Sequence, residues 1–148
     1  MARRTHIKIK GKIVEGLGEG TKFTRIPWVR DQLVSKLSID PFPGTLNLEV
    51  SGRDDLENLE TLRWIDGIEI IPEDPSFCRG KCYPALMGGR LRGAVVLPDV
   101  PDYPVNKIEL ISGENVKETL SMNAGDVLEV EILLENQAVN STVGDRSL

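Results

Sequence analysis

The sequence predicts a mainly β protein: a small Greek-key barrel of six or seven short strands, with one main helix and short helical turns. Segments that alternate apolar and polar residues recur at roughly regular spacing along the 148 residues. Strands and helices do not alternate, which argues against a doubly wound sheet. The length suits one domain, which we expect over residues 1–135. The polar residues 136–148 predict a disordered tail.

Composition and charge limit the classes of protein to consider. Apolar residues make up 40% and charged residues 28% of the chain, as is usual for a soluble globular protein. The net charge of −5 argues against sequence-independent binding of nucleic acid, for which a basic surface is expected. No apolar run approaches membrane-spanning length, and residues 1–6 lead into a strand rather than a signal peptide. We therefore expect a cytoplasmic protein that binds neither nucleic acid nor membrane, and we take it to be a monomer.

Histidine and cysteine offer little for metal or nucleophilic chemistry. Cys78 and Cys82 share one Cys-Arg-Gly-Lys-Cys segment, and a zinc site needs a second pair of ligands, which is missing nearby. We expect free thiols or, at most, one local disulfide. The single histidine, His6, is far away in sequence and has no Ser or Cys motif beside it, which removes most nucleophilic triads.

The start of the chain combines a strand, a glycine-rich segment and a helix. Isoleucines alternate with lysines over residues 7–15 and predict a strand. Residues 16–21, Gly-Leu-Gly-Glu-Gly-Thr, predict a loop whose backbone N–H groups can cradle phosphates, although such loops more often only turn a hairpin. The segment is neither a Walker A motif nor a dinucleotide fingerprint. Apolar spacing predicts a helix over residues 27–37, with Pro27 in its first turn, packed across an end of the barrel or sheet.

Residues 41–50, Pro-Phe-Pro-Gly-Thr-Leu-Asn-Leu-Glu-Val, predict a turn that leads into a strand. Alternate side chains of a strand share a face, so the aliphatic residues after Gly44 face the core while Thr45, Asn47 and Glu49 face the other side. A hydroxyl and a carboxamide oxygen two residues apart can hold a hard cation such as Mg²⁺ when phosphates and waters complete its shell. The alternative is a half-buried strand whose polar residues face solvent.

The rest of the chain predicts strands joined by loops. Residues 52–62 alternate acidic residues with leucines and predict either one short helix or a solvated connector. Five strands are expected, over residues 68–71, 82–87, 90–97, 108–112 and 127–134. Pro84 predicts an edge or a bulge in the second of them. Residues 73–81 and 98–104 predict loops, and residues 115–120 predict one helical turn.

Four blocks of the sequence, taken in order and spacing, match the pattern of one family. They are Gly-Leu-Gly-Glu-Gly (16–20), Pro-Gly-Thr-Leu-Asn-Leu (43–48), Gly-Ala-Val-Val-Leu-Pro with the Tyr-Pro and Ile-Glu-Leu-Ile that follow (93–111), and Asn-Ala-Gly-Asp-Val-Leu-Glu-Val (123–130). Together they resemble the archaeal CTP-dependent riboflavin kinases. The resemblance implies a six-stranded barrel of the cradle-loop kind. It also implies transfer of the terminal phosphoryl group of CTP to the 5′-hydroxyl of riboflavin, giving FMN and CDP with Mg²⁺ as the cofactor.

The resemblance implies roles for particular residues. Two segments would bind the nucleotide: Gly16, Leu17, Gly18, Glu19, Gly20 and Thr21 on one side, and Val116, Lys117, Glu118 and Thr119 on the other. Thr45 and Asn47 would hold Mg²⁺, as the similar Thr-Ala-Asn motif does in the ATP-using flavokinases. Glu109 would face the flavin or its ribityl chain, with Tyr103 also on the flavin side. Glu109 is the candidate general base; the alternative is that it only hydrogen-bonds the ligand.

Two positions depart from the family pattern. Members usually carry Leu-Arg-Glu where this chain has Val-Lys-Glu over residues 116–118. Lys117 keeps the positive charge but lacks the planar, two-pronged donor of arginine. Many members place a threonine ahead of the tyrosine where this chain has Pro101, which has neither a hydroxyl nor an N–H to offer a flavin. That contact is therefore not expected here.

Two other functions stay open at this point. One is a non-catalytic barrel that binds a small ligand or a partner protein and uses the glycine-rich segment only as structure. The other is a cradle-loop barrel of the transcription-factor kind, but the acidic charge and the lack of a DNA-binding helix pair count against it. Residue spacing does not distinguish CTP from ATP, so that preference comes from the resemblance alone.

Overall fold

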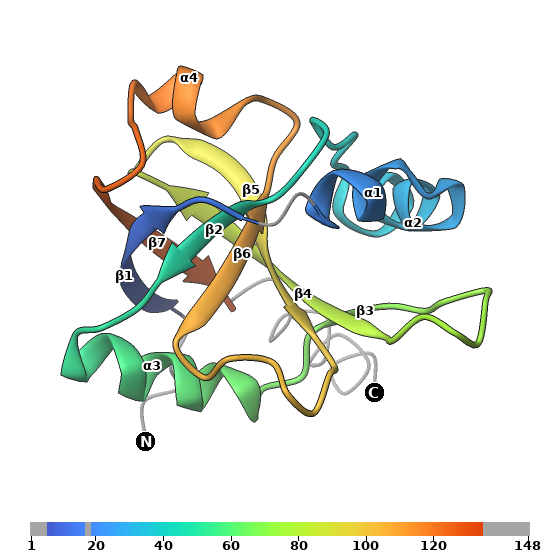
Figure 1. Cartoon of the computed structure of the whole chain (residues 1–148), viewed down its shortest axis with the longest axis horizontal. Helices are drawn as coiled ribbons and strands as arrows, with labels where there is room; N and C mark the ends of the chain where they lie inside the picture. Colours follow the sequence, from blue (N-terminus) through green and yellow to red (C-terminus); the bar gives the residue numbers. More distant parts are fainter. Residues whose placement is uncertain (1–5, 17–18, 135–148) are drawn as a thin grey trace, which may run out of the picture.

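Six antiparallel strands form a closed barrel in the computed structural model, which describes residues 6–16 and 19–134 (Figure 1). The strands of the barrel are β1 (His6–Val14), β2 (Leu46–Glu49), β4 (Gly80–Met87), β5 (Leu91–Pro98), β6 (Lys107–Ile111) and β7 (Val127–Leu133). Their order is β4-β5-β6-β2-β1-β7, and pairing of β7 with Ala85–Met87 of β4 closes the circle. A seventh strand, β3 (Ile68–Ile70), pairs with β4 outside the barrel. The predicted fold class is confirmed.

The interior of the barrel follows the period-two alternation of the sequence. On β1, Ile7, Ile9 and Ile13 are at most 1% exposed, and the lysines between them face solvent. The aliphatic residues of β7 alternate with glutamates in the same way. On β2, Leu48 is fully buried, and Val50 just beyond the strand is 1% exposed. These side chains belong to one apolar core, so the face predicted for each of these strands is confirmed.

The described residues form four helices, which pack on the sides and ends of the barrel: α1 (Glu19–Arg25), α2 (Pro27–Leu37), α3 (Arg53–Arg63) and α4 (Val116–Leu120). The prediction for α2 is confirmed in its bounds, and α4 confirms the predicted helical turn. The open alternative for residues 52–62 is resolved as a helix. Asp54 and Asp55 lie in the first turn of α3 and Arg63 in its last, which suits the helix dipole. None of the helices described is long and apolar enough to cross a membrane.

The helix that was expected across an end of the barrel lies on its side instead. Val29 and Leu33 of α2 are fully buried against outward-facing side chains of β4 and β5, in a second apolar cluster. The end is covered by α3, because Leu59 and Leu62 enter the main core. Figure 1 shows α3 and α4 at opposite ends of the barrel, with α1 and α2 beside it. The expected position of α2 was therefore wrong.

The glycine-rich segment is only partly a loop. Residues 17 and 18 lie outside the described residues, but α1 already begins at Glu19, so the loop predicted as far as Thr21 is too long. Packing explains the difference: the helix puts Phe23 against the second apolar cluster and buries Thr24. The Thr24 hydroxyl accepts a hydrogen bond of 2.9 Å from the Gly44 backbone N–H, which ties α1 to the turn before β2.

Pro84 lies in the middle of β4, which is not an edge strand. β4 pairs with β5 along its whole length. On its other side, Gly80–Cys82 pair with β3 and Ala85–Met87 pair with β7, so Pro84 falls between these two pairings. A proline is tolerated there because no described strand pairs with it on that side. The prediction of an edge or a bulge was wrong in both forms, because β4 pairs on both sides and its register with β5 is unbroken through Pro84, although Pro84 does occupy a local gap in the pairing.

Gly93 on β5 should be among the positions most sensitive to a single methyl group. A Cβ at Gly93 would collide with the backbone carbonyl oxygen of Ile111 on β6 and with the Met87 side chain. The carbonyl cannot turn away without separating two paired strands, so Gly93→Ala should lower the free energy of unfolding by roughly 2 kcal/mol or more. Urea denaturation measures this. Gly80→Ala is the control, because its Cβ would meet only Val96 Cγ1 at 3.9 Å and should leave stability nearly unchanged.

Candidate active site

Three side chains from two separate segments of the chain meet where β2 lies beside β6. Thr45, just before β2, donates its hydroxyl to Glu109 Oε1 at 2.8 Å. The Tyr103 hydroxyl donates to the other oxygen, Glu109 Oε2, also at 2.8 Å. All three side chains are partly buried, and Glu109 pairs with Asn47 in the register of β2 and β6. The structure thus brings together three of the predicted site residues and places the fourth next to them.

The carboxylate of Glu109 is held in the acceptor role by these two donors. Burial, and next the negative charge of Glu109, raise the pKa of Tyr103 well above that of a free tyrosine. Tyr103 therefore stays protonated at neutral pH and remains a donor. Lys107 lies 5.5 Å from the centroid of the Tyr103 ring and adds a cation–π contact on the same strand as Glu109.

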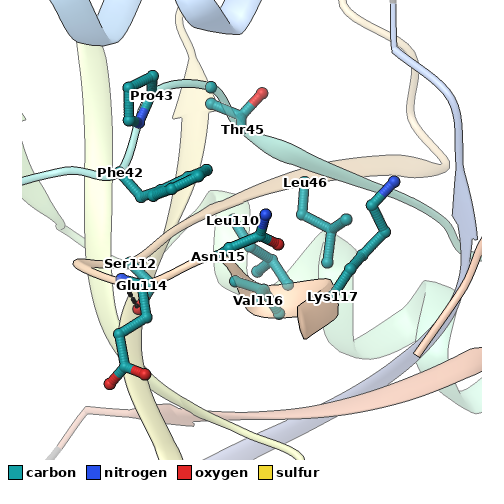
Figure 2. Close-up of a pocket in the computed structure, with 11 residues that line it drawn as sticks. Phe42, Pro43, Thr45, Leu46, Leu110, Ser112, Glu114, Asn115, Val116 and Lys117 are labelled. Atoms are coloured by element: carbon teal, nitrogen blue, oxygen red, sulfur yellow. Dashed lines mark hydrogen bonds between the residues drawn. The ribbon is translucent and has the colours of Figure 1, made fainter. Parts of the chain in front are cut away.

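Two cavities adjoin Thr45, one on each side. The first, called here the Lys117 cavity, measures about 140 Å³ and lies between the turn before β2 and the start of α4 (Figure 2). Phe42, Thr45, Asn115 and Lys117 are among its lining residues. Figure 2 shows the aromatic ring of Phe42 on one side of it and the Lys117 side chain on another.

The second, the Phe77 cavity, measures about 200 Å³ and has Thr45 and Glu109 in its wall. Its other lining residues are mostly apolar and come from α1, from the segment before β4 together with the first residue of β4, and from β5: Phe23, Phe77, Cys78, Arg79, Gly80, Val96 and Pro98. Thr45 lines both cavities, and no other described residue does. A larger hollow of about 680 Å³ lies near the end of α2, but none of the predicted site residues lines it.

Asn47 is a buried polar residue with spare hydrogen-bonding capacity. Its side chain is 7% exposed, and within the described part of the chain its carboxamide makes no hydrogen bond. A Cβ added at Gly16 would collide with Asn47 Nδ2, so the glycine-rich segment reaches this amide where no other residue fits. Buried amides are normally hydrogen-bonded, so a carboxamide that has no partner among residues 6–16 and 19–134 is a candidate ligand contact.

The residues at this point fit a magnesium ion that is held mainly by its substrate. Thr45 uses its proton on Glu109, which leaves the hydroxyl lone pairs available, and the Asn47 carboxamide adds a second neutral oxygen. Among residues 6–16 and 19–134 there is no cluster of three or more His, Cys, Asp or Glu that could hold a metal alone. Mg²⁺ commonly keeps several waters and takes few protein ligands besides substrate phosphates, which this donor set allows.

The predicted nucleotide-binding residues are only partly gathered around the Lys117 cavity. Val116 and Lys117 line it, though the Val116 side chain is 7% exposed and packs into the core. Glu118 is exposed and Thr119 hydrogen-bonds Glu114 at 2.9 Å, and neither lines the cavity. The Asn115 side chain caps α4 by accepting from the Glu118 N–H at 3.2 Å. Of the glycine-rich segment, Gly16 is placed beside Asn47; Leu17 and Gly18 lie outside the described residues, as does the predicted tail.

Sequence reasoning missed several aromatic and polar lining residues. Phe42 was treated only as part of a turn, yet its ring is 42% exposed next to the predicted metal motif. The sequence feature that could have pointed to Phe42 is its place between two prolines, which favours an exposed turn. For Phe77 and Arg79 the sequence predicts only a loop, and no local pattern shows that this loop shares a cavity with Glu109. Cys78 is exposed and Cys82 buried, both with free thiols, which resolves the open question about a disulfide. Burial raises the pKa of the Cys82 thiol to about 12.

Comparison with known proteins gives a consistent result. The family model CTP-dep_RFKase, described as "Domain of unknown function DUF120", matches residues 13–132. A riboflavin kinase of Sulfurisphaera tokodaii is 37% identical over 132 residues, covering 86% of this chain and 96% of that protein. A riboflavin kinase of Sulfolobus acidocaldarius is 35% identical, covering 90% and 86%. One of Methanosarcina acetivorans is 36% identical, but the 81% of this chain that aligns spans only 51% of that longer protein.

Proposed function

Because this chain belongs to the family of CTP-dependent riboflavin kinases, we propose that it transfers the terminal phosphoryl group of CTP to the 5′-hydroxyl of riboflavin, giving FMN and CDP. The observation that carries the proposal is the position of Thr45 in the walls of both the Lys117 cavity and the Phe77 cavity. A phosphoryl donor in one cavity and an acceptor in the other would meet at this residue. Such an approach is what direct, in-line transfer requires.

The Lys117 cavity suits the nucleotide. Lys117 offers a positive charge to phosphate oxygens, and Phe42 offers an aromatic face on which a base can stack. Gly44 and Thr45 line the cavity and directly precede β2, the strand that carries Asn47. A nucleotide lying there would point its terminal phosphate toward Thr45 and Asn47 and toward the glycine-rich segment at Gly16.

The Phe77 cavity suits the flavin. Phe23, Phe77, Val96 and Pro98 give it a largely apolar lining that matches a flat, apolar ring system. Glu109 is the carboxylate in that lining and would receive a hydroxyl of the ribityl chain. A pocket with an apolar body and one well-placed polar group fixes both the position and the orientation of its ligand.

The proposed chemistry needs positioning and charge neutralisation more than a covalent step. Mg²⁺, held by Thr45 and Asn47 together with phosphate oxygens, would neutralise the charge on the transferred group. Lys117 would hold the nucleotide from the other side. Glu109, kept as an acceptor by Thr45 and Tyr103, would orient the 5′-hydroxyl and take its proton. His6 is not needed, because it lies at the start of β1, where Nδ1 pairs with Glu131 at 2.8 Å.

The direct test is incubation of the purified protein with riboflavin, Mg²⁺ and CTP, followed by separation of FMN from riboflavin and of CDP from CTP. We expect FMN and CDP in equal amounts, and loss of both when EDTA removes the metal. Parallel reactions with ATP, GTP and UTP test the nucleotide. Faster turnover with ATP would contradict the CTP preference. Riboflavin binding without FMN from any nucleotide would instead indicate a non-catalytic ligand-binding barrel.

A further inference from the structure

The loop between β5 and β6, residues 99–106, carries Tyr103 but has little packing of its own. Every residue of the loop except Tyr103 is exposed, including Val105 at 70%. Two prolines, Pro101 and Pro104, remove backbone donors from it. Burial therefore cannot fix the loop, and its geometry depends on a few hydrogen bonds.

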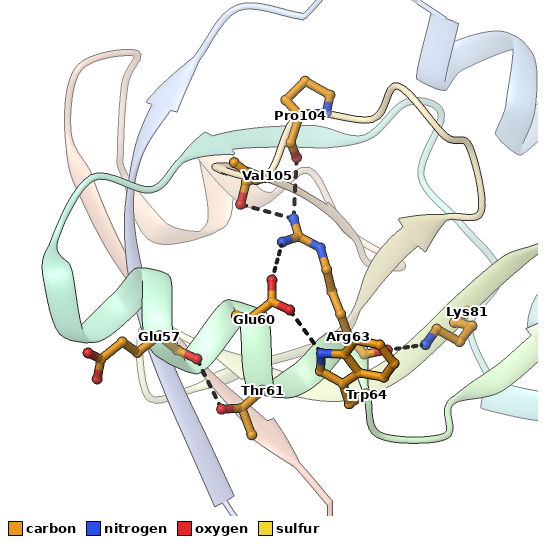
Figure 3. Close-up of polar contacts among 8 residues, drawn as sticks. All are labelled: Glu57, Glu60, Thr61, Arg63, Trp64, Lys81, Pro104 and Val105. Atoms are coloured by element: carbon orange, nitrogen blue, oxygen red, sulfur yellow. Dashed lines mark hydrogen bonds and ion pairs between the residues drawn. The ribbon is translucent and has the colours of Figure 1, made fainter.

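Arg63, the last residue of α3, holds this loop from outside (Figure 3). Its Nη2 donates to the carbonyl of Val105 at 2.9 Å and to the carbonyl of Pro104 at 3.3 Å, so it grips the residues that directly follow Tyr103. Within the described chain, Arg63 is the side chain that donates hydrogen bonds to this loop, and the Tyr103 side chain of the loop donates to Glu109. The backbone adds three hydrogen bonds. The Asp99 N–H donates to the Arg79 carbonyl at 2.8 Å and the Tyr103 N–H to the Val100 carbonyl at 3.1 Å, before the residues that Arg63 holds; the Val50 N–H donates to the Asn106 carbonyl at 2.7 Å, after them.

Arg63 is itself held in place. Its side chain is 25% exposed, and Nη1 pairs with Glu60 at 3.3 Å. Lys81 on β4 donates to its backbone carbonyl at 2.8 Å. The buried Tyr83 hydroxyl lies within hydrogen-bonding distance of the carbonyls of Leu62 and Ile65, at 3.1 and 2.7 Å, which fastens the end of α3 to the barrel. The guanidinium is thus part of a rigid element rather than a mobile surface group.

We propose that Arg63 is a positioning residue for the acceptor side of the site, acting through the loop that presents Tyr103 to Glu109. The proposal rests on the proposed function, because it assigns Glu109 to riboflavin. The contacts form one chain: Arg63 holds the Pro104 and Val105 carbonyls, Tyr103 then reaches Glu109, and Glu109 accepts from Thr45. Nothing in that chain touches the Lys117 cavity except Thr45, so the effect should be felt by riboflavin more than by the nucleotide.

The planar fork of arginine matters for this role. One guanidinium nitrogen bridges two successive carbonyls while the other engages Glu60. Lysine would keep the charge but could not hold the same three acceptors in a fixed plane. Trp64 provides a matched control, because it lies next to Arg63, bonds the same Glu60 through Nε1 at 2.9 Å and is 82% exposed, but does not hydrogen-bond the loop.

The experiment compares Arg63→Ala, Arg63→Lys and Trp64→Phe with the wild-type protein in steady-state kinetics with each substrate varied. Arg63→Ala should raise the KM for riboflavin roughly tenfold, since small displacements of positioning groups have effects of this size. The KM for CTP should stay unchanged, Arg63→Lys should fall in between, and Trp64→Phe should behave as wild type. Hydrogen exchange gives a readout without turnover: the backbone amides of Tyr103 and Val50 should exchange faster in Arg63→Ala.

The outcomes are distinguishable. An unchanged KM for riboflavin, or an equal rise for both substrates together with a lower midpoint of unfolding, would overturn the positioning role. Full activity of Arg63→Lys would show that charge alone suffices and would overturn the two-carbonyl bridge. If the wild-type protein forms no FMN, the proposed function fails and the role toward riboflavin falls with it, whereas the exchange rates still report whether Arg63 anchors the loop.

Discussion

Replacing Asn47 with alanine should abolish FMN formation while leaving the barrel folded. In the proposed mechanism the carboxamide supplies the second neutral oxygen to Mg²⁺, and losing a group that supports a metal commonly costs on the order of a hundredfold in activity or affinity. The side chain makes no hydrogen bond among the described residues, so its removal should not lower the free energy of unfolding. Steady-state turnover over a range of Mg²⁺ concentrations measures the first effect, and urea denaturation measures the second.

Asn58→Ala is the matched control for that result. Asn58 on α3 donates from Nδ2 to the Lys8 carbonyl at 2.8 Å and lies away from both cavities. Its loss should lower stability by about 1 kcal/mol and leave turnover intact. Asn47→Ala should therefore lose turnover and keep its stability, whereas Asn58→Ala should lose stability and keep its turnover. If Asn47→Ala loses activity only in step with stability, as a structural residue would, the metal-ligand role is wrong.

Glu109→Gln should reduce turnover by roughly a hundredfold or more, the usual loss when a general base is removed. Glutamine keeps the shape but loses the charge. Its NH₂ group is a donor and cannot accept, so one of the two hydrogen bonds from Thr45 and Tyr103 is lost. Separate measurement of kcat and of the KM for riboflavin decides between the two roles of this residue. A fall in kcat supports the base, whereas a higher KM with normal kcat means that Glu109 only binds the ligand.

Tyr103→Phe tests whether the orientation of the Glu109 carboxylate matters apart from its negative charge. It removes one donor to Glu109 and leaves the negative charge in place. We expect a smaller loss of kcat than in Glu109→Gln, because Thr45 still holds the other oxygen. An equal loss in both variants would mean that the orientation of Glu109, and not its basicity, limits the reaction.

Strand and helix periodicity predicted much of this fold, because an element that buries one face has apolar residues at regular spacing in its sequence. The alternation on β1 and β7 and the spacing in α2 are examples, and the bounds of α2 were correct. The polar face of β2 likewise indicated Thr45 and Asn47, because residues two apart on a strand share a face. Their partner Glu109 is 64 residues from Thr45, so only the resemblance to a family connected it to them.

The errors came from contacts that no local pattern records. The start of α1 depends on packing of Phe23 and on the bond between Thr24 and Gly44, which are 20 residues apart. α2 and α3 both have an apolar face, and sequence alone does not say which one covers the open end of a barrel. Sequence alone also does not show that Phe42 and Phe77 line cavities, because each cavity is formed by residues from several segments of the folded chain.

One edge of β4 pairs with β3 in its first part and with β7 in its last part, and this arrangement leaves part of the Phe77 cavity outside the barrel. Ala85–Met87 close the barrel, whereas Gly80–Cys82 extend past the closure and carry β3. Phe77, Cys78 and Arg79 approach the Phe77 cavity from the exposed segment that leads into this extension, outside the circle of strands. Substitutions or insertions there can reshape the pocket without disturbing strand register or the main core. If the Phe77 cavity takes the acceptor as proposed, changes in this segment would alter acceptor specificity and leave the strands of the barrel in place.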